Sequence, residues 1–412
     1  MTTFTTIFLL ALAAGVAIEL WLLQRHVDTV RRHRHAVPEA FRERIALPEH
    51  QKAADYALDK GTLYRVELLL QPLPLLLLTI GGGIDWIHAL WQSTEPPLLA
   101  GSGLIASVFL VLGLIGLPFS IWRTFVLERK FGFNRTTPGR FLIDMLLQAL
   151  LSLALGLPVI LAILWLMQRA GEFWWFGAWL VWIGFSLLIS WLYPTLIAPL
   201  FNRFTPLQAG PLRERIDALL ERIGFASNGI FVMDGSTRSG HGNAYFSGLG
   251  RQKRIVFFDT LIETLDAAEL EAVLAHELGH FKRRHVLKQL VLSGLFALVG
   301  LALLGWLAQH SWFYQGLGVT EHSNALALLL FLLVSPVFTQ FLQPLLGRLS
   351  RRYEFEADSF AVAQTGTEPM INALVKLYRD NASTLTPDPL YSAYHDSHPP
   401  APVRIAQLMT TD

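Results

Sequence analysis

The stretch AVLAHELGHFKRRHVLKQLVLSGLF, residues 272–296, carries signals for both the fold and the chemistry of this chain. Its first half contains His276-Glu277-x-x-His280, and its second half starts an apolar run long enough to cross a bilayer. On a helix, His276 and His280 lie one turn apart on one face, so both rings can bind one metal ion. Glu277 lies beside them, where it can take a proton from a metal-bound water. The stretch therefore predicts a zinc site at the root of a membrane helix.

The composition of the 412 residues predicts an integral membrane protein. Hydrophobic residues make up 52% of the chain and charged residues 16%, and the mean hydropathy is +0.41, well above that of soluble proteins. The net charge of +1 and the lack of a basic stripe indicate no nucleic-acid partner. The absence of Cys excludes disulfides, thiolate ligands and a cysteine nucleophile.

Several apolar segments are long enough to span a bilayer of about 30 Å. The seven segments lie near residues 4–24, 64–91, 101–122, 142–168, 173–198, 286–309 and 324–347. Positive charges follow the first segment instead of preceding it, which is typical of an uncleaved anchor and not of a signal peptide. The predicted fold is therefore mainly α, with seven transmembrane helices.

The segments that connect these spans predict their orientation. Lys and Arg are concentrated in residues 25–60, 123–140, 199–285 and the tail after residue 348, whereas the connections 92–100 and 310–323 contain none. Cytoplasmic loops of membrane proteins carry the excess of Lys and Arg. The N-terminus is therefore expected outside, and the HExxH segment and the C-terminus in the cytosol.

This orientation divides the chain into two membrane parts and two cytosolic parts. The expected parts are spans one to five with their cytosolic loops (1–198), a catalytic part that carries HExxH (199–285), spans six and seven (286–348), and a second catalytic part (349–412). GIFVMDG and KRIVFFDTLI are typical of short strands, and GHGNAYFSG of a further extended piece, which predicts a small α+β domain. Asp266 and Glu269 form a capping box before a helix that we expect to continue into the sixth span.

A catalytic zinc ion needs a third protein ligand and an open position for water. Residues 281–320 contain no Asp or Glu, which excludes a thermolysin-like ligand about twenty residues after the motif. A hairpin of spans six and seven would return the segment RRYEFEADSFA to the same surface. There Glu354 and Asp358 share a helix face, while Glu356 points elsewhere. One of the pair should bind zinc, and the other should orient a ligand histidine.

Long stretches of the chain resemble the CAAX prenyl protease 1, or a-factor-converting, family of membrane zinc metalloproteases. They include LERKFGFNRTTP, YPTLIAPLFNRFTPL, RSGHGNAYFSGLG, KRIVFFDTLI, HELGH, RRYEFEADSFA and SHPPAPVRI, and the resemblance covers almost the whole chain. It implies that Glu354 is the third ligand of one zinc ion and that Asp358 orients a ligand histidine. It also implies seven helices around a large intramembrane chamber, with a gluzincin-like domain at its cytosolic end.

Two further stretches predict parts of the site. In HGNAYF, the extended backbone of Asn243, Ala244 and Tyr245 is suited to add the substrate as a β-strand, although an ordinary edge strand fits the sequence equally well. In SHPPAPVR, the resemblance implies that His398 stabilises the oxyanion and that Arg404 braces a ligand or a substrate carbonyl. His285 and His395 receive no catalytic role, and His285 is interpreted as a structural histidine.

The predicted function is a zinc endopeptidase that cleaves near the C-terminus of CAAX-type, prenylated or other membrane-associated peptides, with Glu277 as general base. The alternatives are a broad quality-control protease for membrane proteins and a non-enzymatic transporter with a vestigial metal domain. The expected partners are a peptide or protein substrate and the lipid bilayer, and the chain is expected to be a monomer. Arg outnumbers Lys by 26 to 7, which favours a bacterial inner membrane, with the endoplasmic reticulum membrane as the eukaryotic alternative.

Overall fold

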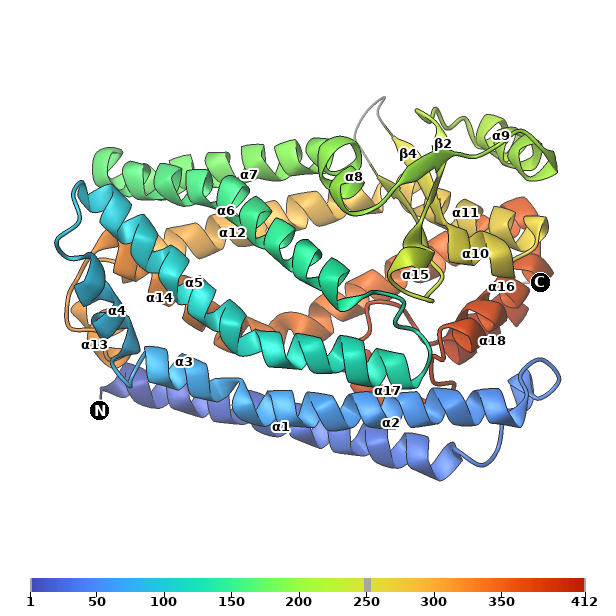
Figure 1. Ribbon diagram of the computed structural model, residues 1–412, viewed down its shortest axis with the longest axis horizontal. Helices are drawn as coiled ribbons and strands as arrows, with labels where there is room; N and C mark the ends of the chain where they lie inside the picture. Colours follow the sequence, from blue (N-terminus) through green and yellow to red (C-terminus); the bar gives the residue numbers. More distant parts are fainter. Residues whose placement is uncertain (1, 248–252, 411–412) are drawn as a thin grey trace.

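The computed structural model describes residues 2–247 and 253–410 of the chain. Helices run along its longest axis, and a mixed domain of strands and shorter helices forms one end (Figure 1). The helices of the long part are α1 (Thr3–His33), α2 (Leu47–Leu70), α3 (Pro72–Leu78), α4 (Gly83–Trp91), α5 (Pro97–Trp122), α6 (Pro138–Arg169), α7 (Trp174–Leu192), α12 (His285–Leu307), α13 (Ser311–Gly316), α14 (Asn324–Thr339) and α15 (Gln343–Thr365). Short turns of π- or 3₁₀-helix extend or join them, including η2 (Arg123–Glu128), η4 (Tyr193–Ile197) and η6 (Gln340–Leu342).

Six helices in the described ranges are long and apolar enough to cross a membrane, and a bent pair makes a seventh. The bent pair joins Leu47–Leu78 to Gly83–Trp91 at 50°. Gly82 at the bend has φ 77°, a conformation that glycine adopts at no steric cost. The second predicted span is therefore a broken helix, because the glycine run 81–83 interrupts it.

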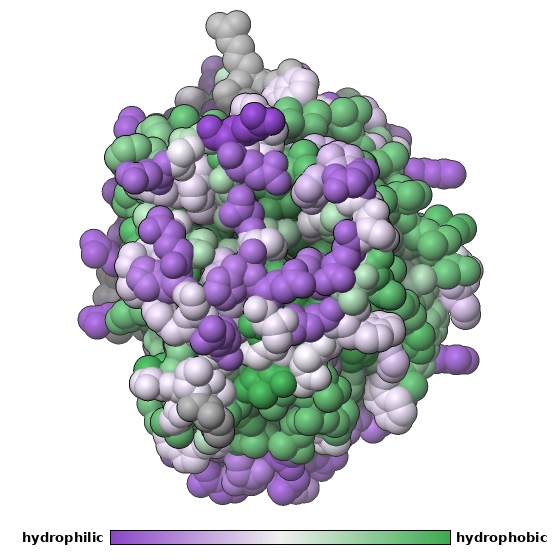
Figure 2. Space-filling model, turned by 90° about the vertical axis from the view of Figure 1, so that its left-hand side faces the viewer, coloured by the Kyte–Doolittle hydropathy of each residue, from purple (hydrophilic) through white to green (hydrophobic). Residues whose placement is uncertain are grey.

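The outer surface of these helices is apolar. Leu110, Ile143 and Val299 are each more than 60% exposed in the isolated chain, as expected for side chains that contact lipid. Viewed from the end that carries α4 and α13, hydrophilic residues gather across that end and hydrophobic residues cover much of the sides (Figure 2). The chain is an integral, multi-pass membrane protein, as its composition predicts.

The mixed domain is built on a four-stranded sheet. Its strands are β1 (Phe204–Pro206), β2 (Ile230–Met233), β3 (Ala244–Ser247) and β4 (Arg254–Phe258), in the order β1-β2-β4-β3. β2 and β4 are parallel, and the two outer strands are antiparallel to their neighbours. β2, β3 and β4 coincide with the three predicted extended segments, whereas the three-residue β1 is too short to predict from its pattern.

Short helices complete the domain. They are α9 (Pro211–Ile223), α10 (Asp259–Thr264), α11 (Ala267–Lys282), α16 (Thr367–Asp380) and α18 (Ala401–Met409). Of two further short helices, α8 (Ala198–Phe201) ends the candidate span that contains α7, and α17 (Pro389–His395) packs on α1 and α15. α11 packs closely against α15, and a side chain at Gly279 would place its Cβ 3.0 Å from the Cα of Ala357. The glycine inside HELGH thus permits the close contact between the two helices.

The helix that carries HExxH does not continue into the membrane. Asp266 caps α11 and Glu269 completes the predicted capping box, but α11 ends at Lys282 and α12 begins at His285. Between them Arg284 has the left-handed φ of 58°. The expectation of one continuous helix is therefore wrong, because α11 must pack on α15 while α12 packs on α7 and α14.

A cavity of about 1130 Å³ lies between the membrane helices and the mixed domain. Its walls come from α1, α2, η2, the segment 239–243, α16 and α17. Lys60, Glu67, Arg123 and Glu128 contribute charged side chains to these walls. The predicted fold class, a helical membrane protein around a chamber with a small α+β domain, is confirmed.

Candidate metal centre

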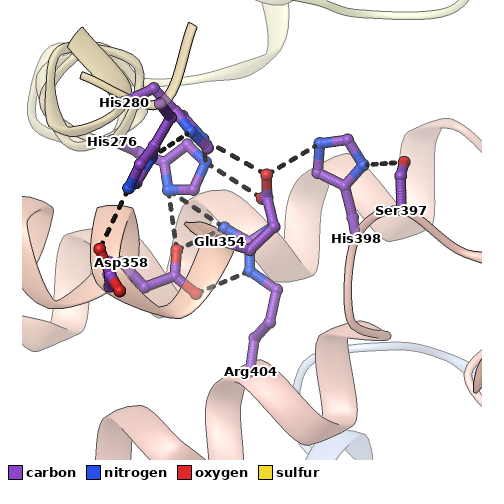
Figure 3. A network of polar contacts seen from close by, with 9 residues as sticks. His276, His280, Glu354, Asp358, Ser397, His398 and Arg404 are labelled. Atoms are coloured by element: carbon purple, nitrogen blue, oxygen red, sulfur yellow. Dashed lines mark hydrogen bonds and ion pairs between the residues drawn. The ribbon is translucent and has the colours of Figure 1, made fainter. Parts of the chain in front are cut away.

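Three side chains from α11 and α15 converge at one point (Figure 3). Nε2 of His276 lies 3.2 Å from Nε2 of His280. The two carboxylate oxygens of Glu354 lie 3.4 Å from His276 Nε2 and 3.3 Å from His280 Nε2. His276 and Glu354 are buried and His280 is half-buried. The spacing i, i+4 on α11 and the packing of α15 beside it produce this arrangement.

These separations fit a tetrahedral metal ion. Zinc ligands at 2.0–2.1 Å in tetrahedral geometry lie about 3.3 Å from one another. The two histidine nitrogens are 3.2 Å apart, and each lies 3.3–3.4 Å from one of the two carboxylate oxygens of Glu354, which matches this value. Oε2 of Glu354 is buried and accepts no hydrogen bond, and a buried carboxylate oxygen without a donor is costly. The three residues can therefore hold a zinc ion.

A buried ion pair of Asp358 and Arg404 lies beside Nδ1 of His276, the ring nitrogen that faces away from the other two candidate ligands. Nδ1 of His276 lies 2.8 Å from Oδ1 of Asp358, and Nε of Arg404 donates to Oδ2 of Asp358 at 2.8 Å. Asp358 and Arg404 are both buried. Hydrogen bonds of this kind fix the orientation and the tautomer of a ligand histidine. Arg404 therefore contacts the carboxylate of Asp358, and its Nη2 also lies 3.4 Å from Nδ1 of His276.

Glu277 faces a pocket of about 180 Å³ beside the cluster. His276, His398, Arg404, Asn243 and Ala244 are among the other residues that line it. Burial raises the pKa of the Glu277 carboxyl above its ordinary value. A carboxylate with a raised pKa is suited to accept a proton from water.

His398 reaches the cluster from the segment between α17 and α18. Its Nε2 lies 3.3 Å from Oε1 of Glu354, and its Nδ1 contacts the hydroxyl of Ser397 at 2.9 Å (Figure 3). The side chain is 63% exposed and lines both the pocket and the large cavity. An imidazole in this place can donate a hydrogen bond to a carbonyl oxygen that enters the pocket.

β3 supplies the edge of the sheet that borders the pocket. Asn243 and Ala244 line the pocket, whereas the ring of Tyr245 packs edge-on against Phe258. The backbone of β3 pairs with β4 on one side, and no other described strand pairs with its second side. The structure thus brings the first two predicted residues to the site and turns the third side chain away.

Sequence reasoning missed the contacts that His285 and Glu356 make near the cluster. Nδ1 of His285 lies 3.0 Å from Nδ1 of His280, and Nε2 of His285 lies 3.1 Å from Oε2 of Glu356. Glu356 does point away from the candidate metal ligands, but it contacts His285, which in turn contacts His280. No sequence signal could reveal this contact, because it depends on the helix break at Arg284.

The fold and this cluster define the class of the protein, an integral membrane metalloprotease. Residues 26–203 match the family model for the CAAX prenyl protease N-terminal part with five membrane helices, and residues 206–412 match peptidase family M48. The chain belongs to the M48 peptidase family, and its resemblance to the CAAX prenyl protease 1 group is confirmed. This membership makes the chain a hydrolase that acts on peptide bonds and excludes a non-enzymatic transporter.

Relatives align with almost the full chain. The CAAX prenyl protease 1 homolog of Dictyostelium discoideum is 36% identical over 373 residues, which cover 88% of this chain and 87% of the relative. The homolog of Arabidopsis thaliana is 34% identical and covers 88% of both chains. The crystal structure of S. mikatae Ste24p superimposes with a TM-score of 0.90 at 28% identity and covers 99% of both chains. The shared fold therefore includes the membrane helices as well as the mixed domain.

Proposed function

We propose that this chain is a zinc endopeptidase whose metal ion is held by His276, His280 and Glu354. The observation that carries the proposal is the convergence of two histidine nitrogens 3.2 Å apart, each of which lies 3.3–3.4 Å from one carboxylate oxygen of Glu354. Two imidazoles and one carboxylate are a common ligand set of catalytic zinc. The bound ion would supply a Lewis acid for the substrate carbonyl and would make a water molecule more acidic.

The side chains around this point would divide the remaining work. Glu277 would take the proton from the attacking water and later give it to the leaving amine, for which its raised pKa suits it. His398 would donate a hydrogen bond to the oxygen on which negative charge develops. Asp358 and Arg404 would hold His276, and the open edge of β3 at Asn243 and Ala244 would align the substrate backbone.

The substrate that we propose is a peptide segment near the C-terminus of a membrane-associated protein. The names of the relatives support CAAX-type, prenylated peptides. A second candidate is broad cleavage of membrane-associated polypeptides in quality control. The charged residues of the cavity walls, such as Lys60, Arg123 and Glu128, favour this second candidate, because they suit a polypeptide better than an isoprenoid.

We also propose an orientation and an assembly state for the protein. Residues 199–285 and 349–412 would lie in the cytosol, and the N-terminus on the opposite side, because Lys and Arg concentrate in these parts. The composition supports a bacterial inner membrane as the location. The protein would act as a monomer, since every residue of the proposed site comes from one chain.

Metal analysis and peptide cleavage by the purified protein test the proposal. The wild type should contain one zinc per chain and lose activity with a chelator. Glu354→Ala should lose both zinc and activity, whereas Glu277→Ala should keep zinc and lose about 10²–10⁴-fold of its activity. Glu214→Ala, at an exposed position of α9, serves as the control and should match the wild type. Zinc loss in Glu277→Ala, or activity in Glu354→Ala, would contradict the assigned roles.

A pair of peptides with the same sequence, one prenylated and one not, tests the substrate. A kcat/KM that is much higher for the prenylated peptide supports CAAX processing. Equal values for both peptides support the broad protease instead.

A further inference from the structure

His285 is the first residue of α12 and is 1% exposed. Its two ring nitrogens make different contacts, with Nδ1 at 3.0 Å from Nδ1 of His280 and Nε2 at 3.1 Å from Oε2 of Glu356. The other oxygen of Glu356 accepts a hydrogen bond from Nε of Arg352 at 3.1 Å. A chain of polar contacts therefore leads from His280 through a buried imidazole to a carboxylate.

The direction of the hydrogen bonds in this chain follows from the position of His280. Nε2 of His280 faces His276 and Glu354, so it is the nitrogen that is available to a metal ion. A neutral imidazole that binds metal through Nε2 carries its hydrogen on Nδ1 and donates it. Nδ1 of His285 must then accept, so His285 carries its own hydrogen on Nε2 and donates it to Glu356. Each ring nitrogen thus has one partner and one role.

Two structural features hold His285 in this position. The left-handed φ of 58° at Arg284 is unfavourable for a residue with a side chain, and it redirects the chain so that the first residue of α12 meets His280. The ring of His285 also stacks on Tyr353, with the centroids 4.2 Å apart and the planes at 14°. Tyr353 precedes Glu354 directly, so the stacked ring is fixed to the helix that carries the carboxylate ligand.

We propose that His285 and Glu356 are positioning residues of the metal centre, which fix the tautomer and the ring orientation of His280. The two histidines of HExxH are then supported differently. His276 donates directly to the carboxylate of Asp358, whereas His280 donates to a neutral imidazole that Glu356 in turn orients. The inference rests on the proposed zinc site, because His280 needs a fixed tautomer only as a ligand.

Zinc affinity of the full-length protein, measured by competition with a chromogenic chelator, tests the inference. His285→Phe keeps the aromatic stack on Tyr353 and removes both nitrogens. It should weaken zinc binding about 10- to 100-fold, the usual effect of losing a partner of a ligand histidine. His285→Asn places an amide oxygen near the former Nδ1 and should restore part of this loss. The matched control is His322→Phe. His322 stacks on Tyr314 with the ring centroids 4.4 Å apart, away from the site, so this variant should leave zinc affinity unchanged.

The second residue of the chain gives an independent test. Glu356 is 29% exposed, so Glu356→Leu should fold even if His285 variants do not. It should weaken zinc binding by a smaller factor than His285→Phe, and Glu356→Gln should weaken it less than Glu356→Leu. The Tm of each metal-free variant, measured by thermal unfolding, should be similar to that of the metal-free wild type.

The possible results separate this inference from the proposed function. Wild-type protein without zinc, or His280→Ala with unchanged zinc affinity, would contradict the zinc site itself. If the wild type binds zinc and His280→Ala loses it, two results would overturn only the role of His285. One is wild-type zinc affinity in both His285→Phe and Glu356→Leu, and the other is an equal loss in His285→Phe and His322→Phe.

Discussion

At the scale of single residues, the ion pair of Asp358 and Arg404 connects stability to metal binding. Both side chains are buried, Arg404 is paired with Asp358, and Asp358 also contacts His276. Removal of one member of a buried pair leaves an uncompensated charge and typically costs about 3–5 kcal/mol, whereas replacement of both by apolar residues costs much less. We therefore expect Asp358→Leu to lower the Tm of the metal-free protein more than the double variant Asp358→Leu, Arg404→Met.

Thermal unfolding in detergent measures this difference. Both variants lose the hydrogen bond to His276, so both should also bind zinc about 10- to 100-fold more weakly. A double variant that is less stable than Asp358→Leu alone would show that the buried charge is not the source of the instability.

A second prediction at this scale concerns pH. Burial lowers the pKa of His276, but its contacts with the carboxylates of Asp358 and Glu354 outweigh burial and raise the pKa to about 9 in the metal-free protein. Zinc binds only the neutral ring, so binding below pH 9 must displace one proton. The titration of His276 should therefore raise zinc affinity about tenfold per pH unit as the pH approaches 9. Above this pH, His276 should contribute no further increase.

Calorimetry in buffers of different ionisation enthalpy should detect this released proton at pH 7. The Asp358→Leu variant should release less, because His276 loses a carboxylate that stabilises its charged form. Equal proton release in both proteins would argue against this coupling.

The residues of the site differ in how far the sequence could predict them. The spacing of His276 and His280 on one helix face is sufficient to bring their rings together. Glu354 is 74 residues further on, and the choice between it and Asp358 needed the resemblance to a known family. The contact of His285 with His280 was unpredictable, because helical spacing places the two residues on different faces unless the helix is interrupted.

At the scale of secondary-structure elements, β3 is the edge that we expect to hold the substrate. Ala244 lies opposite Phe257, and the carbonyl of the preceding Asn243 accepts from the N–H of Phe258 at 3.0 Å. Because pairing alternates along antiparallel strands, the N–H and C=O of Ala244 point to the open side. In the structure this N–H donates to Oδ1 of Asn243 at 2.8 Å, so a substrate strand would have to replace that contact. Proline at 244 removes the N–H without removing a bond to β4.

We expect Ala244→Pro to raise KM strongly while zinc content and the sheet are retained. Ala244→Ser keeps the N–H with a side chain of similar size and is the control. Steady-state kinetics with one peptide substrate compare the three proteins. Unchanged KM in Ala244→Pro would remove β3 from the substrate site.

The elements themselves followed from the sequence except at their breaks. The apolar runs and the capping box at Asp266 predict the helices well, because hydropathy and capping are local properties of the sequence. The break at Arg284 did not follow, because the demand that α11 and α12 pack on different partners is a tertiary effect. The bend after α3 is an intermediate case, since three consecutive glycines mark it but do not reveal its angle of 50°.

At the scale of the whole molecule, the membrane helices and the mixed domain border a large cavity that has both charged and apolar walls. The cavity of about 1130 Å³ borders the candidate metal centre, because His398 lines both this cavity and the smaller pocket beside the centre. Backbone and charged groups at membrane depth are tolerated where they face protein or water. A cavity of this kind therefore explains how a hydrolytic site can lie at the root of membrane helices, which the sequence alone leaves as a contradiction.

The orientation of this molecule in the membrane gives the last prediction. The end that carries α4 and α13 has polar residues (Figure 2), yet its connections 92–100 and 310–323 contain no Lys or Arg. The opposite end carries the basic segments and the metal centre, and the excess of positive charge is expected in the cytosol.

Two reporters test this orientation, one that is active only in the cytosol and one that is active only outside it. At a fusion site after Asp412, or an insertion site after Ala36, only the cytosolic reporter should be active. At an insertion site near Ser323, only the external reporter should be active. The fusion proteins should still cleave peptide, which checks that they are folded. An external signal from the fusion after Asp412 in a catalytically active protein would reverse the orientation and place the metal centre outside the cytosol.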